Sequence, residues 1–599
     1  MTQLKTFFER HTKSQRTLSN IVAHYYFLYH LGTYLNFKHR EKMDFKIQVV
    51  FFSIFLFFKN SYSNSVQKKH VVLIVADDLG WNDISFHGSN QIVTPNIDIL
   101  AYSGIILQNY YVMPVCTPSR SALMTGIHPI HTGMQEGVIH NGQPFGLPLN
   151  LKILPEYLKE YGYKTRAVGK WHLGFHEKVY TPTYRGFDSH FGYWGGKDDY
   201  YTHKNGIGIY DGLDLRRNMN VTWNYTGQYS TDIFTQESVD IINSHNTSEP
   251  LFLYLAHQAV HTGNHKHPLQ APSEIVQKFK YIKNEQRRIL AAMIWKLDES
   301  VGKVVQALAS RNILNDTIII FTSDNGGPVV GMEGSHASNW PLRGAKTTFW
   351  EGGVRGASFV WSADLPHSKV SHTLMHIQDW LPTIIGAIDG NIVNNSTLLK
   401  ELDGHNMWPI LKGEKNFEYD ELIIQRGNNT SALRKNNWKI ISMDKLPLHS
   451  EWAGPSGRGK YYKYNITEIQ HSPSAIALYQ NNFTIPSEEE IIEVRANVTL
   501  SCTYCGDNGT ECIPCSQSLH NVTVCLFDVS KDPCEKNNLA HKYPDILTDL
   551  VEIMDKYVPV SPLNQPRDPR SNPMFWNNTW TNWMDYEPQN SSIVESSGI

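Results

Sequence analysis

Short, strongly apolar runs alternate with longer amphipathic stretches between about residue 66 and residue 415. Residues 286–311 carry apolar side chains at helical spacing and predict one long amphipathic helix. Strands that alternate with helices predict an α/β fold, in which a mostly parallel sheet is covered by helices on both faces. The runs that we interpret as buried strands are rich in β-branched and aromatic residues; they are residues 70–76, 165–168, 251–256, 317–322 and 357–361.

Polar clusters follow four of these predicted strands at the point where each strand ends. In open α/β sheets ligands bind beyond the carboxyl ends of the strands, because parallel strands end at the same edge. We therefore expect the four clusters to meet at one rim and to form an active site. They are Asp77-Asp78, residues 169–172 (GKWH), residues 257–261 (HQAVH) and residues 323–327 (SDNGG).

The length of 599 residues and a change in composition predict three parts. Residues 1–65 form an N-terminal extension with targeting sequence, and residues 66–415 form the main domain. Residues 416–599 are rich in Asn, Ser, Pro and Cys, with short strand-like pieces such as 421–425 and 438–442. We interpret this last part as a smaller α+β domain with disulfides and an irregular tail.

Met43 begins a stretch that has the parts of a signal peptide. A basic Lys46 precedes the apolar run 47–58, and the small residues Ser61 and Ser63 follow it. The run is too short to span a bilayer comfortably, so we expect no stable membrane span; a signal anchor is the alternative. We take Met43 as the natural start and residues 1–42 as an extension of the gene model.

Other sequence features agree with entry into the secretory pathway, and we expect a lysosomal or extracellular protein. Asn-x-Ser/Thr sequons recur along the chain; examples are Asn220, Asn246, Asn315, Asn465, Asn497 and Asn521. The 27 histidines would add roughly twenty positive charges below about pH 6 if most of them took up a proton. That change would suit an acidic compartment and a polyanionic substrate. A formal net charge of -3 argues against nucleic acid as a partner.

The seven cysteines divide unevenly between the two halves of the chain. Cys116 stands alone, and the other six fall within a short C-terminal stretch; they are Cys502, Cys505, Cys512, Cys515, Cys525 and Cys534. The spacing of the first four is shorter than zinc modules use, and an oxidising compartment favours disulfides. Six cysteines allow fifteen connectivities, and Cys525–Cys534 is a plausible pair because its loop is short.

Asp77, Asp78, Asp324 and Asn325 offer hard oxygen ligands after two of the predicted strands. Such a set suits Ca²⁺ or Mg²⁺ better than zinc, because no thiolate or imidazole cluster accompanies it. The alternative is that Asp77-Asp78 merely caps the next helix. The second carboxylate–amide pair favours the metal site.

The segment C-T-P-S-R-S-A-L-M-T-G at residues 116–126 is the sharpest motif in the chain. Pro118 suits the first turn of a helix and places Cys116 at a helix N-terminus, where unpaired N–H groups favour an anion. The segment resembles the signature of the sulfatase family, in which C-x-P-x-R directs oxidation of the cysteine to formylglycine. The resemblance implies an alkaline-phosphatase-like α/β sandwich and a separate formylglycine-generating enzyme as a partner during biosynthesis.

The resemblance also implies a role for each residue that matches a family motif. Asp77, Asp78, Asp324 and Asn325 resemble the ligands of one Ca²⁺ ion, to which Cys116 as formylglycine adds an oxygen. Arg120 resembles the arginine that holds the modified residue. Lys170 and His172 resemble the lysine and the histidine that flank the sulfate. Lys346 resembles the lysine that contacts substrate.

Within the family the motifs are most similar to those of the animal arylsulfatase B group; they are G-K-W-H-L-G, P-L-R-G-x-K and L-Y-L-A-x-Q-A-V-H. This chain departs from that group by inserting residues 262–267 (TGNHKH) before Pro268. His261 best matches the catalytic histidine, and His257, His265 and His267 compete with it. The implied substrate is a sulfated glycosaminoglycan, in particular its N-acetylgalactosamine 4-sulfate groups.

The implied mechanism begins with attack on sulfur by one hydroxyl of the hydrated aldehyde at position 116, with Asp324 as proton acceptor. His261 and Lys346 protonate the departing oxygen, while Lys170, Arg120 and the metal hold the sulfonyl oxygens. Loss of a proton from the second hydroxyl to His172 then eliminates sulfate. The alternatives are a phosphoesterase of the same superfamily and a secreted glycan-binding protein that has lost catalysis.

Overall fold

Strand β1 (His70–Ala76) lies at the centre of the main sheet and contributes to the hydrophobic cores on both of its faces, as the computed structural model of the protein shows. Side chains alternate between the two faces of a strand. Val72, Ile74 and Ala76 accordingly belong to one hydrophobic core, and Val71, Leu73 and Val75 belong to the other. A strand with two apolar faces must be covered on both sides, as the unbroken apolar run in the sequence predicts.

The structure describes residues 69–586 with ten gaps, and the predicted signal segment lies outside them; the gaps are residues 207–209, 330, 390–400, 428–429, 445–447, 449, 453, 460–461, 503–514 and 518–522. The chain divides into residues 1–67 and 68–599, and the fold is that of the second unit. Among the described residues, no helix combines the length and the apolar character needed to cross a bilayer.

The main sheet has ten strands in the order β13-β2-β12-β11-β1-β10-β4-β5-β8-β9. Parallel pairing joins β11, β1, β10, β4 and β5, and antiparallel strands extend the sheet on both sides. The predicted mostly parallel sheet is therefore confirmed. The five runs predicted as strands correspond to β1, β4, β10, β11 and β12. Besides β1 the strands are β2 (Ile105–Leu107), β4 (Lys164–Lys170), β5 (Ser189–Tyr193), β8 (Arg216–Arg217), β9 (Asn220–Val221), β10 (Leu251–Ala256), β11 (Thr317–Ser323), β12 (Ser358–Trp361) and β13 (Lys369–Ser371).

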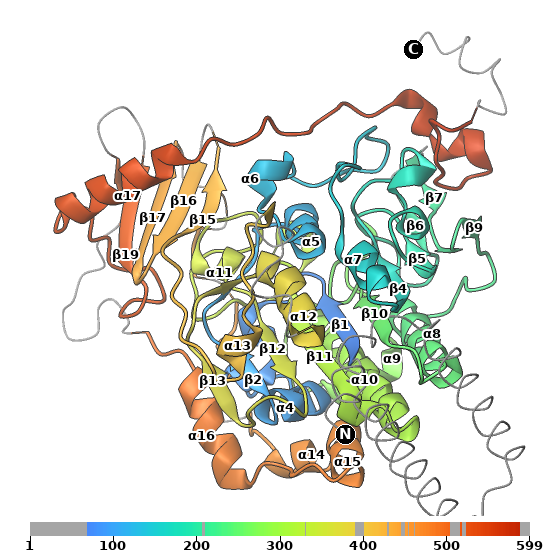
Figure 1. Cartoon of the computed structure of the whole chain (residues 1–599), viewed down its shortest axis with the longest axis horizontal. Coiled ribbons are helices and arrows are strands. Elements are labelled where there is room, and N and C mark those ends of the chain that lie inside the picture. Colours follow the sequence, from blue (N-terminus) through green and yellow to red (C-terminus); the bar gives the residue numbers. More distant parts are fainter. Residues whose placement is uncertain are drawn as a thin grey trace, which may run out of the picture. The chain divides into compact units, whose positions relative to one another are not determined.

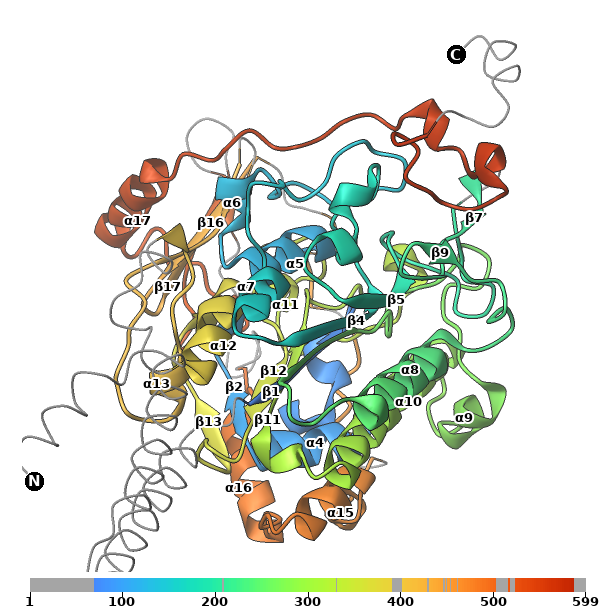
Figure 2. The same ribbon diagram turned by 45° about the vertical axis from the view of Figure 1, so that its right-hand side comes forward.

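Helices cover both faces of this sheet (Figures 1 and 2). The core on one face includes α4 (Pro95–Tyr102), α8 (Ser230–Ser244) and α10 (Glu285–Ser310), and α10 is the long amphipathic helix that the sequence predicts. The core on the other face includes α5 (Cys116–Thr125), α7 (Leu154–Glu160) and α12 (Trp380–Ile388). The smaller elements are β3 (Tyr110–Tyr111), β6 (Lys204–Asn205), β7 (Gly212–Leu213), β14 (Met375–His376), α6 (Pro129–Thr132), α9 (Ser273–Lys278), α11 (Glu351–Val354) and α13 (Trp408–Leu411).

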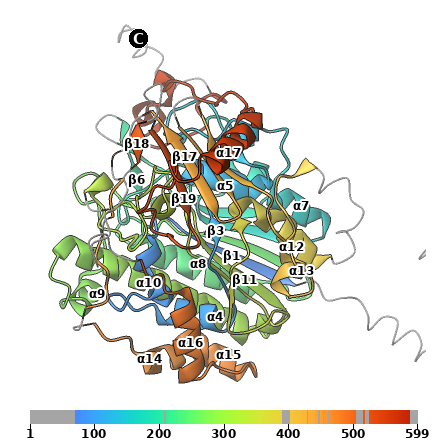
Figure 3. The same cartoon turned by 90° about the vertical axis from the view of Figure 1, so that its left-hand side faces the viewer.

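The C-terminal region contributes to more than one core. Its five-stranded sheet packs against α17 (Pro544–Lys556). Its three shorter helices pack instead beside α4 and α10 (Figure 3); they are α14 (Ile466–Gln470), α15 (Pro473–Gln480) and α16 (Glu488–Val498). The boundary near residue 415 stays a prediction. The strands of the small sheet are β15 (Leu422–Arg426), β16 (Thr430–Lys435), β17 (Trp438–Met443), β18 (Ser516–Gln517) and β19 (Thr523–Asp528).

An extended segment after α17 runs back across the main domain (Figure 1). Its backbone N–H groups donate to the main domain at Val560 (to Ile130 O, 2.8 Å), Asp568 (to Gly142 O, 2.8 Å) and Trp580 (to Leu213 O, 3.0 Å). We call residues 558–586 the C-terminal strap. The tail is irregular, as the sequence predicts, but it buries the Trp580 and Trp583 side chains in the core of the main domain.

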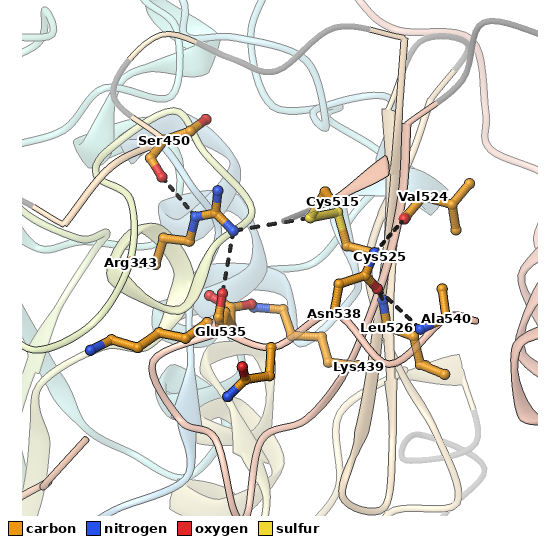
Figure 4. The surroundings of a disulfide bond; sticks show 12 residues. Arg343, Lys439, Ser450, Cys515, Val524, Cys525, Leu526, Glu535, Asn538 and Ala540 are labelled. Atoms are coloured by element: carbon orange, nitrogen blue, oxygen red, sulfur yellow. Dashed lines mark hydrogen bonds and ion pairs between the residues drawn. A yellow bond between two sulfur atoms is a disulfide. The ribbon is translucent and has the colours of Figure 1, made fainter. Parts of the chain in front are cut away.

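The disulfide pairing differs from the pair that the short loop favoured. Cys502 bonds to Cys534, and Cys515 bonds to Cys525 (Figure 4). The proposed Cys525–Cys534 bond is therefore wrong, because β19 holds Cys525 opposite the end of β18. Cys505 and Cys512 lie outside the described residues. Cys116 is a free, buried cysteine.

Many of the histidines lie inside the protein, and this changes the expected response to acid. Burial lowers the pKa of His70, His190 and His376 to about 4 each, and that of His257 to about 3. These side chains stay neutral when the surrounding pH falls to 6. The idea that most histidines become charged below pH 6 is therefore wrong for the buried ones.

His70 should make the stability of the fold depend on pH. Its Nδ1 accepts a hydrogen bond from the backbone N–H of Leu251 (3.0 Å), which requires the neutral ring. The pKa falls from 6.5 in the unfolded chain to about 4 in the fold. The unfolded state thus binds more protons between these values, and stability is lost as pH drops through this window. The slope from this one group is at most about 1.4 kcal/mol per pH unit.

Denaturant unfolding between pH 7 and pH 4 measures this effect. We expect the His70→Asn variant, which keeps an acceptor but does not titrate, to lose less stability over this range than the wild type. His541→Asn, at an exposed position, is the matched control and should follow the wild type. Parallel curves for wild type and His70→Asn would contradict the assignment.

Candidate active site

Four side chains reach the same point from the carboxyl ends of four strands. Asp77 follows β1, Lys170 ends β4, His261 follows β10 and Asp324 follows β11. β1, β4, β10 and β11 are neighbours in the sheet, so their ends lie at one edge. The structure thus brings together the polar clusters that the sequence places after separate strands.

Cys116 is the first residue of α5, with Pro118 in the same first turn. Its Sγ lies 3.5 Å from Asp77 Oδ1, and the side chain is buried at the wall of a cavity. Burial raises the pKa of the thiol well above its usual value. An unmodified Cys116 therefore stays protonated and is a poor nucleophile.

The oxygen ligands expected for a metal lie beside Cys116. Asp78 Oδ1 accepts a hydrogen bond from Asn325 Nδ2 (2.7 Å), and the Asp78 N–H donates to Asp324 Oδ1 (3.3 Å). Ligand atoms of Asp77, Asp78, Cys116 and His261 all fall within 4.8 Å of one another. This is a buried acidic cluster of the kind that holds a metal ion.

Two observations on these residues fit a bound cation. Asn325 Oδ1 is buried and has no hydrogen-bond partner among the residues that the structure describes. Burial, followed by the neighbouring Asp324 carboxylate, raises the pKa of Asp77 to about 8. A divalent cation would give the amide oxygen a partner and would favour the ionised form of Asp77.

Basic side chains balance these carboxyl groups. Arg120 donates to Asp324 Oδ2 through Nε (3.1 Å) and Nη2 (2.8 Å), and Lys170 Nζ donates to Asp77 Oδ2 (2.7 Å). Lys346 Nζ lies 2.9 Å from Asp78 Oδ2. Arg120 and Lys170 lie behind the cavity wall, whereas Lys346 lines the cavity.

The histidine candidates separate by position. His261 Nε2 lies 3.2 Å from Lys346 Nζ, and burial and Lys346 lower the pKa of His261 well below its usual value. His172 lines the same cavity, and its Nε2–H donates to Ile139 O (3.0 Å). His257 is buried elsewhere against Ser300 Oγ (2.8 Å), which removes it as a competitor. His265 reaches the cavity, and His267 lies on the exposed surface.

Backbone strain accumulates around the cluster. Asp78, His172 and Thr347 have φ values of 59°, 61° and 73°, in the left-handed region that side chains other than glycine seldom adopt. Each lies in the cluster or next to one of its residues. Strain of this kind is retained where the surrounding structure fixes functional side chains.

A cavity of about 580 Å³ opens over Cys116. Sequence reasoning missed several residues that line it, because they come from loops without a recognisable motif. Glu333 lies 3.1 Å from Lys346 Nζ, and the C-terminal strap contributes Arg567 and Trp580. The other missed residues of the lining include His140, Lys197 and Tyr210.

The C-terminal region contacts Arg343, which precedes Lys346 in the same loop (Figure 4). Arg343 Nε donates to Ser450 O (2.8 Å) and Nη1 to Glu535 O (3.3 Å), beside the Cys515–Cys525 disulfide. The backbone N–H of Gly344 donates to Glu451 O (3.1 Å). These bonds fix the chain just before Lys346.

Comparison with known proteins identifies the class to which this fold and site belong. A family model described as Sulfatase matches residues 69–390. The chain is 37% identical over 550 residues to arylsulfatase J of Mus musculus, covering 86% of this chain and 81% of that protein. The chain therefore belongs to the sulfatase family and is an enzyme that hydrolyses sulfate esters.

Other relatives carry more specific names. N-acetylgalactosamine-6-sulfatase of Homo sapiens is 31% identical over 374 residues, which cover 58% of this chain and 67% of that protein. The crystal structure of Ps i-CgsB is similar with a TM-score of 0.63 and 30% identity, covering 83% of this chain and 94% of that chain. A second structure of Ps i-CgsB is a complex with k-i-k-neocarrahexaose.

Arg343 should position Lys346 without touching substrate. Replacing it with Lys keeps the charge but loses the two-pronged contact with Ser450 and Glu535. We expect the Arg343→Lys variant to fold and to lose about 10-fold or more in kcat/KM for an aryl sulfate, because small displacements of catalytic groups are costly.

The matched control is Arg288→Lys on α10, whose guanidinium makes two bonds to Ile282 O away from the cavity. Steady-state kinetics and circular dichroism of both variants make the comparison. Equal kinetic losses in the two variants would show that Arg343 acts only through general stability.

Proposed function

We propose that the chain is an arylsulfatase B-like hydrolase that removes sulfate from sulfated sugars, with formylglycine at position 116 as its nucleophile. The observation that carries this proposal is the position of Cys116. It is the first residue of α5, its thiol lies beside Asp77, and it faces a cavity lined by Lys346, His261 and His172. A helix N-terminus and basic side chains favour an anion at this point.

Asp77, Asp78, Asp324 and Asn325 would hold one Ca²⁺ ion, together with an oxygen of the modified residue 116. The unpartnered Asn325 Oδ1 and the raised pKa of Asp77 support this assignment. When bound, the ion would lower the pKa of an oxygen attached to it and offset negative charge on the sulfate group.

The charges of the site favour an anionic substrate. Three carboxyl groups, those of Asp77, Asp78 and Asp324, lie among three cations; the cations are Arg120, Lys170 and Lys346. A calcium ion added to this balance leaves an excess of positive charge, which the one carboxylate of Glu333 beside Lys346 offsets only in part. A sulfate ester brings the negative charge that offsets it.

Each remaining residue has a role that its contacts support. Lys346 Nζ lies 3.2 Å from His261 Nε2, and both side chains line the cavity. The Lys346 ammonium group can therefore give a proton to the departing sugar oxygen, either directly or by passing it through Nε2 of the neutral His261. Asp324 and His172 would accept protons from residue 116. The resemblance implies that Arg120 and Lys170 contact the sulfonyl oxygens, but neither lines the cavity. We therefore propose that they hold the carboxylates and the modified residue from behind. The hydrate of formylglycine supplies the attacking hydroxyl and the second hydroxyl that allows sulfate to leave.

The substrate that we propose is the N-acetylgalactosamine 4-sulfate group of glycosaminoglycans. The names of the N-acetylgalactosamine-6-sulfatase relatives and the carrageenan-type oligosaccharide bound to Ps i-CgsB support a sulfated glycan. The resemblance of the sequence motifs to the arylsulfatase B group supports the 4-sulfate position. Formylglycine-generating enzyme would act on the chain before it folds.

A lysosomal or extracellular location accompanies this function. Two disulfides in the C-terminal region suit an oxidising compartment. Several sequon asparagines are exposed and open to glycosylation; they are Asn220, Asn246, Asn315, Asn465 and Asn497.

Replacing Cys116 tests the proposed nucleophile. We expect Cys116→Ala to reduce turnover of 4-nitrophenyl sulfate by at least about 1,000-fold, because no other group can form the covalent intermediate. The unfolding temperature should stay close to that of the wild type, since the change removes one sulfur atom. The matched control, Cys525→Ala, removes a disulfide and should lower stability instead. Activity retained by Cys116→Ala would refute the mechanism, and an inactive wild type would favour a glycan-binding protein.

Calcium should stabilise the folded protein independently of activity. At a free concentration 100 times Kd, a ligand that binds only the folded state adds about 2.7 kcal/mol to the unfolding free energy. We expect the chelated protein to regain this stability with Ca²⁺, and Asn325→Leu to regain much less of it. Differential scanning calorimetry with and without Ca²⁺ provides the measurement. Asn537→Leu, at an exposed position, is the control; a calcium shift unchanged in Asn325→Leu would exclude Asn325 as a ligand.

A further inference from the structure

A second cavity of about 400 Å³ adjoins the cavity over Cys116. The two cavities share Lys197, Asn205, Gly206 and His265 in their linings, so they lie side by side. We call the second cavity the side lobe. The side lobe is therefore within reach of a sugar next to the one that occupies the main cavity.

The side lobe is lined by basic side chains that have few acidic partners. Neither Lys197 nor Lys266 forms an ion pair with a residue in the described part of the chain. Lys204 Nζ lies 3.7 Å from Asp211, and both side chains are about 40% exposed. A pair so exposed contributes little, so Lys204 remains available to another anion.

The other acid of the side lobe is already engaged. Asp199 Oδ1 accepts hydrogen bonds from the backbone N–H groups of Tyr201 (3.0 Å) and Thr202 (2.7 Å). Its Oδ2 accepts from Gln270 Nε2 (2.6 Å) and from Asn264 Nδ2. Asp199 therefore acts as a structural bridge between two loops and has little capacity to neutralise the lysines.

The inserted residues 262–267 form the wall that this bridge holds. Asn264 Oδ1 accepts from the backbone N–H groups of Lys266 (2.8 Å) and His267 (2.7 Å), and the Gly263 N–H donates to Pro268 O (2.7 Å). The insertion is thus a closed turn that presents His265 and Lys266 to the side lobe. A turn held in this way binds a ligand with a smaller loss of entropy.

We infer that the side lobe is a subsite for a second anionic group, carried by the sugar next to the one whose sulfate faces Cys116. This inference rests on the proposed function. Lys197, Lys204 and Lys266 would contact the second anion, which is either a sulfate ester or the carboxylate of a uronic acid. The preferred substrate is then an oligosaccharide with negative charge on adjacent sugars.

The test compares substrates with one and two anionic groups in the double variant Lys204→Gln/Lys266→Gln. The substrates are N-acetylgalactosamine 4-sulfate, its disaccharide with glucuronate, the same disaccharide with a 2-sulfate on the glucuronate, and the disaccharide with glucose instead. We expect the double variant to lose about 5- to 10-fold in kcat/KM with a two-anion substrate, because each exposed lysine contributes only a modest ion-pair energy. We expect less than about a 2-fold change with the monosaccharide and the glucose disaccharide, because neither places a charge in the side lobe.

The arms of the experiment distinguish the sources of the second anion. A loss with the glucuronate disaccharide assigns the carboxylate, and a loss confined to the disaccharide with the 2-sulfate assigns the sulfate. The charge-matched control Lys280→Gln/Lys283→Gln, on exposed positions outside both cavities, should behave as the wild type. If the lysine double variant lost equally in kcat/KM with one-anion and two-anion substrates, the inference would be overturned. It would also be overturned if Arg567→Gln lost kcat/KM only with two-anion substrates while the lysine double variant lost none.

Binding separates failure of the subsite from failure of the proposed function. In the Cys116→Ala background, calorimetry measures the affinity for the 2-sulfated disaccharide with and without the two lysine changes. We expect the lysine changes to weaken binding by the same 5- to 10-fold factor, even if the wild type hydrolyses none of these substrates. Unchanged affinity would refute the subsite, whereas absent hydrolysis with a retained effect on binding would refute the proposed reaction alone.

Discussion

The interaction on which the rest of the site depends is the buried balance of charge beside Cys116. Asp77, Asp78 and Asp324 are held in the protein interior by Arg120, Lys170 and Lys346. Removing one member would leave a buried charge without a partner, which costs several kcal/mol. The sheet supports this arrangement, because neighbouring strand ends fix the positions of the carboxylates before any ligand binds. Preorganised charges of this kind stabilise a transition state without having to reorganise.

Segments far along the chain complete this central site. The C-terminal region holds Arg343 and, through it, the loop of Lys346. The C-terminal strap brings Arg567 and Trp580 to the cavity, and the 262–267 insertion adds the side lobe. The main sheet therefore supplies the reacting groups, and the later additions shape the space around them. This division agrees with the general rule that loops on a rigid scaffold determine specificity.

The sequence was informative wherever a local pattern determines structure. The unbroken apolar run of β1, the apolar spacing of α10 and Pro118 after Cys116 each depend on near neighbours, and the structure agrees with them. The disulfide pairing was predicted wrongly because the antiparallel pairing of β18 and β19, not loop length, decides which cysteines meet. Glu333 and Arg567 could not be predicted, because only tertiary packing brings them to the cavity. The three-part division and the roles of the site residues stay predictions.

The most direct test of the central claim is mass spectrometry of the tryptic peptide that spans residues 70–120, from protein secreted by eukaryotic cells. Conversion of Cys116 to formylglycine exchanges a CH₂SH group for an aldehyde and lowers the mass of the peptide by about 18 Da. The account predicts this loss, or the mass of the hydrated aldehyde, in most of the active protein. Unmodified cysteine in a preparation with full sulfatase activity would contradict it.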